Sequence, residues 1–258
     1  SFVCYRPIVS LCGGVPVVIE TKEENEFRLT ADELREKITD KTKLLVLPYP
    51  NNPTGAIMRR EDLEAVAKVL KDTNIMIASD EIYSELTYSG KHCSIAEIEG
   101  MRERTIVING FSKSFAMTGW RLGFLGGPKE IVSQMLKLHQ YAIMSSPTVS
   151  QYAAIVAMHS CQKDIDAMRN EYNIRRRFVV DSFNKLGLKC FAPQGAFYVF
   201  PCIKSTGMTS TDFCEKLVYT KKVAVVPGDA FGECGEGYVR VSYAYSLNHL
   251  REAIKRIG

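Results

Sequence analysis

Short apolar runs alternate with segments of helical periodicity in the part of the chain that ends near Ser150. Thr30 and Glu33 form a capping-box pattern ahead of a predicted helix over 31–38, and apolar residues at helical spacing predict another over 61–71. The apolar runs predict short buried strands over Pro16–Ile19, Leu44–Leu47, Ile75–Ala78, Thr105–Ile108 and Leu122–Leu125. This alternation is typical of an α/β protein with a mostly parallel sheet flanked by helices.

The pattern changes after Ser150. An apolar helix is predicted over Gln151–Met158, and a highly charged helix over 164–186 follows it. The rest of the chain predicts three short strands, over Ala196–Pro201, Val223–Val226 and Tyr238–Tyr243. A helix is predicted over Thr211–Tyr219, between the first and second of these strands. We therefore expect two domains, a large α/β domain over 1–163 and a smaller C-terminal α+β domain over 164–258.

The composition indicates a globular protein with a large core, because 46% of the 258 residues are hydrophobic and only 24% are charged. The net charge is +4, but Lys and Arg are interleaved with Asp and Glu, which disfavours nucleic acid as a partner. No apolar run approaches the roughly 18 to 20 residues that span a bilayer, and no charged-then-apolar leader opens the chain. We therefore expect a cytoplasmic protein without a membrane partner.

Cysteine and histidine spacing does not favour a metal site. The eight cysteines include no Cys-x-x-Cys pair, and we expect most of them to be small buried hydrophobic residues in a reducing compartment. The four histidines, His92, His139, His159 and His249, are far apart and lack metal-ligand spacing. No metal ion is therefore predicted.

Two chemically active residues follow predicted strands. Asp80 comes just after the run Ile75–Ala78, near the carboxyl edge of the sheet, where open α/β folds bind ligands. An isolated aspartate there is most often a helix N-cap or a water-facing residue. Lys113 lies between Phe111 and Phe115, in a segment too apolar for an exposed face, although a typical lysine is a solvated surface charge. A lysine whose amine is neutral is a nucleophile toward carbonyl groups.

Two arginines and one turn complete the set of candidate residues. Arg121 can hold a phosphate with two parallel hydrogen bonds, with a strand-edge salt bridge as the alternative, and Ser112 can add a hydroxyl. The turn Pro50–Gly55 follows another strand and can direct an asparagine side chain into the same crevice. Alternation over 238–245 puts Arg240 on one face of a strand, where it needs a structural carboxylate or the carboxylate of a ligand.

Taken together and in this order, these segments resemble the pyridoxal-phosphate-dependent aminotransferases of fold type I, class I/II, over nearly the whole chain. Each motif is weak to moderate alone, whereas the ordered set is highly specific. The segments that carry the resemblance are Asn51–Gly55, Ser79–Tyr83, Ser112–Lys113, Thr118–Gly123 and Tyr238–Ser242. The aspartate and aromatic aminotransferases are the members that the chain is most similar to.

The resemblance implies a pyridoxal 5'-phosphate cofactor at the carboxyl edge of the sheet. Lys113 would hold the cofactor aldehyde as an internal aldimine and then move a proton between the substrate α-carbon and C4′ of the cofactor. Asp80 would pair with the pyridine nitrogen and keep it protonated. Tyr83 and Asn52 would hydrogen-bond the phenolic oxygen of the ring.

The resemblance also implies sites for two anions. Arg121 and Ser112 would bind the cofactor phosphate, Arg240 would clamp the substrate α-carboxylate, and Asn52 would also belong to the substrate-binding residues. Phe2 matches the aromatic position that stacks on the cofactor ring. Many relatives have a hydroxyl residue three positions before the lysine, where this chain has Gly110, so one phosphate contact must come from elsewhere.

The family normally has a further stretch before Phe2, with the first strand of the sheet and a helix N-terminus that binds the phosphate. We therefore expect the chain to be a fragment whose crevice is incomplete without that stretch. Similarity to the family also implies a homodimer with sites at the subunit interface.

The leading functional hypothesis is an aminotransferase that moves an amino group between an L-amino acid and a 2-oxo acid, with aspartate or aromatic substrates favoured. Three alternatives stay open. They are a carbon-sulfur β-lyase on the same scaffold, a non-catalytic effector-binding domain of a transcription regulator, and a fragment that folds but binds nothing. The amino-acid specificity does not follow from the sequence.

Overall fold

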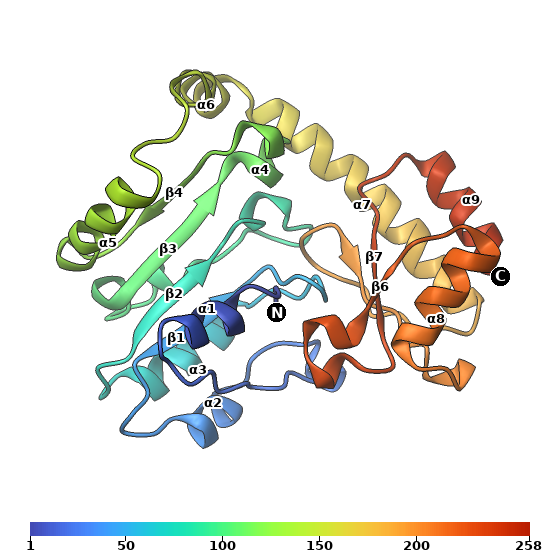
Figure 1. The fold of residues 1–258 in the computed structure, drawn as a ribbon, viewed down its shortest axis with the longest axis horizontal. Helices are drawn as coiled ribbons and strands as arrows, with labels where there is room; N and C mark the ends of the chain where they lie inside the picture. The colour runs from blue at the N-terminus through green and yellow to red at the C-terminus, as the bar shows by residue number, and fades with distance from the viewer.

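A computed structural model describes residues 1–258, and it contains two separate sheets (Figure 1). The first sheet has the strand order β1-β2-β3-β4. Its strands are β1 (Leu44–Pro48), β2 (Met76–Asp80), β3 (Thr105–Gly110) and β4 (Gly123–Gly126). The strands β1, β2 and β3 are parallel, and β4 is antiparallel to β3. The predicted mostly parallel sheet is therefore confirmed.

Two of the predicted buried strands differ from the structure. Residues 16–19 form no strand, and Val17 is 63% exposed, because no neighbouring strand pairs with this stretch. The predicted strand Leu122–Leu125 is present one residue further on, as β4 (Gly123–Gly126), but the residues of β4 are exposed. β4 pairs on one side only, so it is an edge strand and its apolar residues lack a covering layer.

Helices pack against the first sheet and form its core. The helices of this part are α1 (Tyr5–Leu11), α2 (Ala31–Lys37), α3 (Arg60–Leu70), α4 (Phe111–Ser114), α5 (Lys129–Ala142) and α6 (Thr148–Ser160). The predicted capping box is present, since the Thr30 hydroxyl accepts a hydrogen bond from the Glu33 amide and the Glu33 carboxylate accepts one from the Thr30 amide. Leu63 and Val66 of α3 pack with Leu47 and Ile77 of the sheet in one hydrophobic core.

The rest of the chain surrounds a small antiparallel sheet with the order β5-β7-β6. The long helix α7 (Gln162–Lys185) runs from the first sheet to this second one (Figure 1). The other elements are β5 (Tyr198–Val199), α8 (Ser210–Lys216), a π-helical turn (Leu217–Lys221), β6 (Val226–Pro227), β7 (Val239–Ser242) and α9 (Leu247–Ile257). The domain boundary at residue 163 stays a prediction.

One backbone contact ties the two sheets together next to the strand ends. The carbonyl oxygen of Gly55, which lies in the turn after β1, accepts hydrogen bonds from the amides of Gln194 (3.0 Å) and Gly195 (2.9 Å). Gly195 also forms an isolated bridge with Thr87, downstream of β2. The segment that leads into β5 is therefore held against the carboxyl edge of the first sheet.

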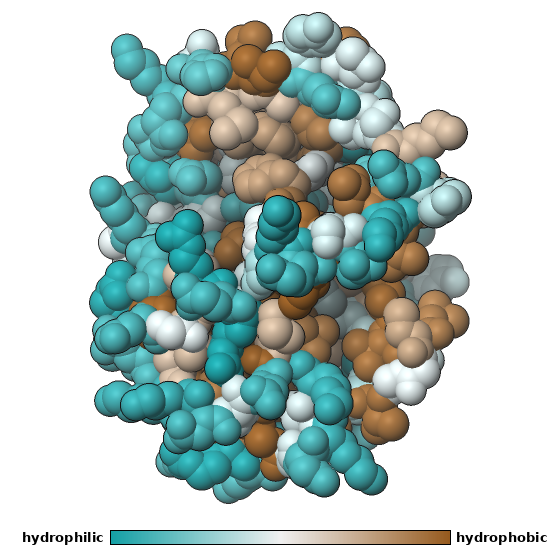
Figure 2. Space-filling model, turned by 90° about the vertical axis from the view of Figure 1, so that its left-hand side faces the viewer, coloured by the Kyte–Doolittle hydropathy of each residue, from teal (hydrophilic) through white to brown (hydrophobic).

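Hydrophobic residues reach the surface on the side of the molecule that carries α5, among hydrophilic neighbours (Figure 2). Tyr141 of α5 is 93% exposed, and the α6 residues Tyr152 and Val156 are exposed as well. Among the helices, none is long and apolar enough to cross a membrane. The expectation of mostly buried cysteines is wrong, because only Cys190 and Cys214 are buried.

Candidate active site

Three strand ends bring candidate residues to one edge of the first sheet. β2 ends at Asp80, and β3 ends at Gly110 and leads directly into α4, which contains Lys113. β1 leads into the turn that contains Asn52. Because these strands are parallel, their carboxyl ends meet at one edge, where open sheets bind ligands.

The Lys113 amine lies near two aromatic rings. Its Nζ is 6.0 Å from the centroid of the Tyr83 ring and 5.7 Å from that of Phe197. Partial burial lowers the pKa of Lys113, and the positive charges of Arg240 and Arg121 lower it further. All three effects favour the neutral amine, which is the nucleophilic form.

Asp80 is oriented by two hydrogen bonds. Its Oδ1 accepts from the Ile82 amide at 3.1 Å, and its Oδ2 accepts from the hydroxyl of Tyr5 in α1. Burial raises the pKa of Tyr5, and the negative charge and hydrogen bond of Asp80 raise it further, so Tyr5 stays a donor. Sequence reasoning missed Tyr5, because nothing local indicates a contact across 75 residues.

Tyr83 is buried and its hydroxyl lies 3.1 Å from the hydroxyl of Tyr198. Burial raises the pKa of Tyr83 well above its ordinary value, and the neighbouring Tyr198 and Asp80 raise it further. Tyr83 is therefore a neutral hydrogen-bonding group beside Lys113 at physiological pH.

Arg240 comes from β7 of the second sheet and contacts the turn that follows β1 of the first sheet. Its Nη1 donates a 2.9 Å hydrogen bond to Oδ1 of Asn52. Its guanidinium carbon lies 4.6 Å from the Tyr198 ring centroid and 5.0 Å from the Phe231 ring centroid. Nε of Arg240 is buried without a hydrogen-bond partner. A buried guanidinium N–H without an acceptor is costly, so this group is suited to an incoming anion.

Ser112 lies in α4, and Arg121 directly follows the 3-10 turn Thr118–Trp120. Arg121 has a left-handed backbone (φ 53°), and its Nη1 donates to the Thr118 carbonyl at 2.8 Å. The Ser112 carbonyl accepts a 2.7 Å hydrogen bond from the Thr118 hydroxyl, which links the two candidate phosphate-binding residues. A Cβ at Gly110 would lie 3.0 Å from Gly123 Cα, so β4 crowds this position.

Phe2 lies three residues before Tyr5, in the segment that leads into α1. Its side chain is 45% exposed. The hydrogen bond from Tyr5 to Asp80 therefore brings this segment to the carboxyl edge of the sheet while the Phe2 ring stays accessible.

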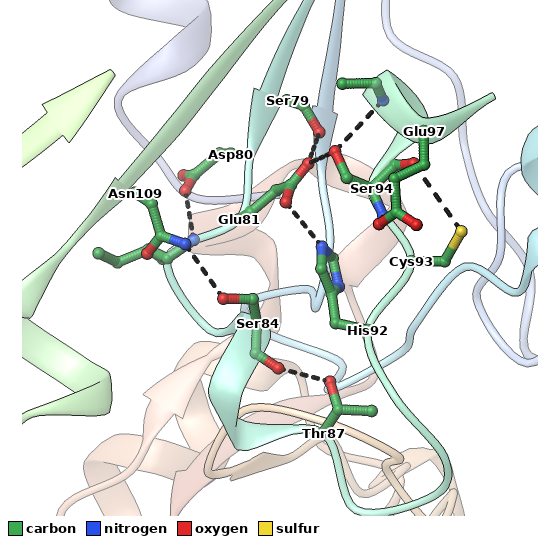
Figure 3. Close-up of polar contacts among 12 residues, drawn as sticks. Ser79, Asp80, Glu81, Ser84, Thr87, His92, Cys93, Ser94, Glu97 and Asn109 are labelled. Carbon is green, nitrogen blue, oxygen red and sulfur yellow. Dashed lines mark hydrogen bonds and ion pairs between the residues drawn. The ribbon is translucent and has the colours of Figure 1, made fainter. Parts of the chain in front are cut away.

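A buried carboxylate next to Asp80 supports the end of β2 (Figure 3). Glu81 accepts hydrogen bonds from the hydroxyls of Ser79 (2.9 Å) and Ser94 (2.6 Å), and its other oxygen lies 2.8 Å from Nε2 of His92. Burial opposes ionisation of Glu81, but these partners, with His92 the strongest, outweigh it and lower the pKa of Glu81. The cluster anchors the loop over 89–94 to the strand end that carries Asp80.

The charges at this edge fit an anionic ligand with an aromatic ring. Lys113, Arg121 and Arg240 take part in none of the ion pairs of the chain. Arg121 and Arg240 both lower the pKa of Lys113, as expected for cations that lie near one another at this edge of the sheet. With the Asp80 carboxylate and the Arg240 Nε, this donor set suits pyridoxal 5'-phosphate, which carries a phosphate, a phenolic oxygen and a ring nitrogen.

Comparison with known proteins identifies the family. The profile of aminotransferase class I and II matches residues 1–257. The chain is 48% identical to the aspartate aminotransferase of Pyrococcus abyssi over 260 residues, which cover 100% of this chain and 67% of that protein. It is 49% identical to aromatic-amino-acid aminotransferase 2 of Thermococcus litoralis over 259 residues, which cover 99% of this chain and 67% of that protein.

A solved structure agrees with these sequence matches. The crystal structure of an aromatic aminotransferase from Pyrococcus horikoshii superposes with a TM-score of 0.97 at 47% identity, covering 100% of this chain and 70% of that one. The chain therefore belongs to the class I and II aminotransferase family, whose members use pyridoxal phosphate. Within the family it is similar to the aspartate and aromatic aminotransferases, and it spans about two thirds of the length of such relatives.

Proposed function

We propose that the protein is a pyridoxal-phosphate-dependent aminotransferase that moves an amino group between an L-amino acid and a 2-oxo acid. The observation that carries this proposal is the group of three cations without carboxylate partners, Lys113, Arg121 and Arg240, near the carboxyl edge of the first sheet. The names of the relatives favour aspartate or an aromatic amino acid as the amino donor. We also propose that the protein acts as a homodimer, as the resemblance to the family implies.

When bound, the cofactor supplies an electron-accepting ring. Lys113 would be the covalent anchor, and its amine, whose pKa is lowered, would move a proton from the substrate α-carbon to C4′ of the cofactor. The Asp80 carboxylate would hold a proton on the ring nitrogen, and the hydrogen bonds from Tyr5 and Ile82 fix the orientation of this carboxylate. Phe2 would stack on the ring.

The polar groups around the amine orient the other parts of the ligand. Tyr83 would donate to the phenolic oxygen, and Asn52 would do so through Nδ2, because its Oδ1 already accepts from Arg240. Arg121 and Ser112 would bind the phosphate. Arg240 binds the substrate carboxylate through its unpartnered Nε.

The full-length protein with pyridoxal phosphate should show a visible absorbance band that is lost in Lys113→Ala and kept in Lys137→Ala, an exposed lysine of α5. Borohydride reduction followed by peptide mapping should place the pyridoxyl label on Lys113. A label on another lysine would overturn the assignment. The expected loss of turnover in Lys113→Ala is at least about 10²-fold, the contribution typical of a general base.

Product analysis separates transfer from elimination. Incubation with an amino acid and 2-oxoglutarate should give one glutamate for each 2-oxo acid formed. Pyruvate and ammonia without glutamate would instead identify a β-lyase on the same fold.

A further inference from the structure

Tyr198 lies between two residues of the proposed site and has no assigned part in it. It is the first residue of β5 and is 7% exposed. In the β5–β7 pair Tyr198 lies opposite Ser242, and Arg240 is two residues before Ser242 on β7. Tyr198 and Arg240 are thus diagonal neighbours on one face of the second sheet, where long side chains reach each other. Ring and guanidinium meet at 4.6 Å.

The hydroxyls of Tyr198 and Tyr83 share one hydrogen bond, so one of their two protons is left over. They lie 3.1 Å apart, and neither forms another hydrogen bond. If Tyr83 donates, the Tyr198 proton has no acceptor in this buried place. If Tyr198 donates, the Tyr83 proton is free to point toward the crevice, where Lys113 lies 6.0 Å from the Tyr83 ring. A bound acceptor in the crevice selects the second arrangement, because a buried donor without a partner is costly.

The backbone before Tyr198 is held firmly. Ala196 is fully buried and has a left-handed backbone (φ 57°), which is costly for a residue other than glycine. Its carbonyl oxygen accepts hydrogen bonds from the hydroxyls of Tyr88 and Tyr243. These hydrogen bonds hold the backbone two residues before Tyr198, so the Tyr198 side chain is oriented by the fold before any ligand binds.

We propose that Tyr198 is a positioning residue that couples the two ends of the site. Its hydroxyl donates to Tyr83 and directs the Tyr83 proton into the crevice, and its ring supports the guanidinium of Arg240. The inference rests on the proposed function, since the acceptor of the Tyr83 proton is the phenolic oxygen of the cofactor. Tyr198 thereby links the protonation state of the bound cofactor to the binding of the substrate carboxylate.

Two substitutions separate the hydroxyl from the ring. Tyr198→Phe keeps the ring on Arg240 and removes the donor. The pH midpoint of the visible band should rise by about half a pH unit, because a weaker Tyr83 hydrogen bond stabilises the negative form of the cofactor less. In Tyr198→Phe, KM for 2-oxoglutarate should stay within about twofold of the wild-type value, because the ring that contacts Arg240 is kept. Tyr198→Leu also removes the ring, so KM should rise by about tenfold, a loss typical of a desolvated cation–π contact.

Four comparisons decide the outcome. If the wild-type protein has no visible band, the proposed function fails, whatever Tyr198 does. If the band is present but both variants keep the wild-type midpoint and KM, the inference about Tyr198 is overturned. In the Tyr83→Phe background, Tyr198→Phe should no longer change the pH midpoint of the visible band. Additive effects of the two substitutions on this midpoint would also overturn the inference about Tyr198. Replacing Tyr198 by 3-fluorotyrosine preserves the size of the side chain and makes its hydroxyl a stronger hydrogen-bond donor. The pH midpoint of the visible band should then fall. An unchanged midpoint contradicts the proposal, even if Tyr198→Phe does not fold.

Discussion

The lowered pKa of Lys113 is a property of its neighbours. Partial burial and the charges of Arg240 and Arg121 all disfavour the ammonium form. Since no carboxylate forms an ion pair with Lys113, nothing nearby reverses the effect. The reactivity of the amine is therefore set before any ligand arrives.

Arg121→Gln should raise the pKa of Lys113, because it removes one of the two like charges that destabilise the ammonium. The pKa can be measured from the pH dependence of Lys113 acetylation, read by mass spectrometry without cofactor. Arg35→Gln is the control, since Arg35 lies in α2 and pairs with Asp32. An unchanged labelling curve in Arg121→Gln would contradict the electrostatic explanation.

Single residues of the site differ in how far the sequence predicted them. Asp80 and Lys113 follow apolar runs directly, so their place at the strand ends could be read from the chain. Tyr5 and Tyr198 could not be found in this way, because they act through contacts across 75 and 115 residues. Neither contact leaves a local pattern in the sequence.

At the level of elements, local signals predicted the parallel strands and the capped helix α2 well. The same local signals did not predict which apolar runs are buried, because burial depends on neighbouring strands and helices that are distant in sequence. Pro16–Ile19 is as apolar as a strand but has no pairing partner, and β4 pairs with β3 on one side only. Apolar content therefore predicted strand propensity better than it predicted burial.

The loop over 89–94 is held to the end of β2 by Glu81, and His92→Ala tests this anchor. The pKa of Glu81 is lowered in the fold, so its ionised contacts add stability at neutral pH that is lost as the pH falls through the folded pKa. His92→Ala should lower the free energy of unfolding at pH 7 by about 1–3 kcal/mol, as expected for a hydrogen bond to a charged group.

Acid unfolding followed by circular dichroism is the second measurement. Without His92 the pKa of Glu81 moves up toward its ordinary value, so the acid midpoint should shift to higher pH. His139→Ala, in the helix α5, is the matched control. Equal acid midpoints in the two variants would mean that His92 does not stabilise the Glu81 carboxylate.

At the level of the whole molecule, Gly55 lies where the turn after β1 packs against the segment that leads into β5. It has φ 71°, and a Cβ there would lie 2.3 Å from Pro193 Cβ and 2.8 Å from the Gly195 carbonyl oxygen. The contact leaves no room for a side chain. Its position also fixes the turn that carries Asn52 against the segment that leads to Tyr198.

Gly55→Ala should destabilise the protein by about 2–4 kcal/mol, from backbone strain together with overpacking. Gly90→Ala is a matched control, because Gly90 has φ 72° but open space around its Cα, so it should cost only about 1 kcal/mol. Urea unfolding of both variants measures the difference. Similar losses in the two variants would show that the contact between the sheets is loosely packed.

The surroundings of Arg240 have an evolutionary consequence. Its guanidinium donates a hydrogen bond to Asn52 and contacts the rings of Tyr198 and Phe231. These three residues belong to separate segments of the chain. A change at any one of these positions alters the same cation, and a compensating change at another can restore it. Natural variation at positions 52, 198, 231 and 240 should therefore be correlated, although nearly 190 residues separate the first from the last.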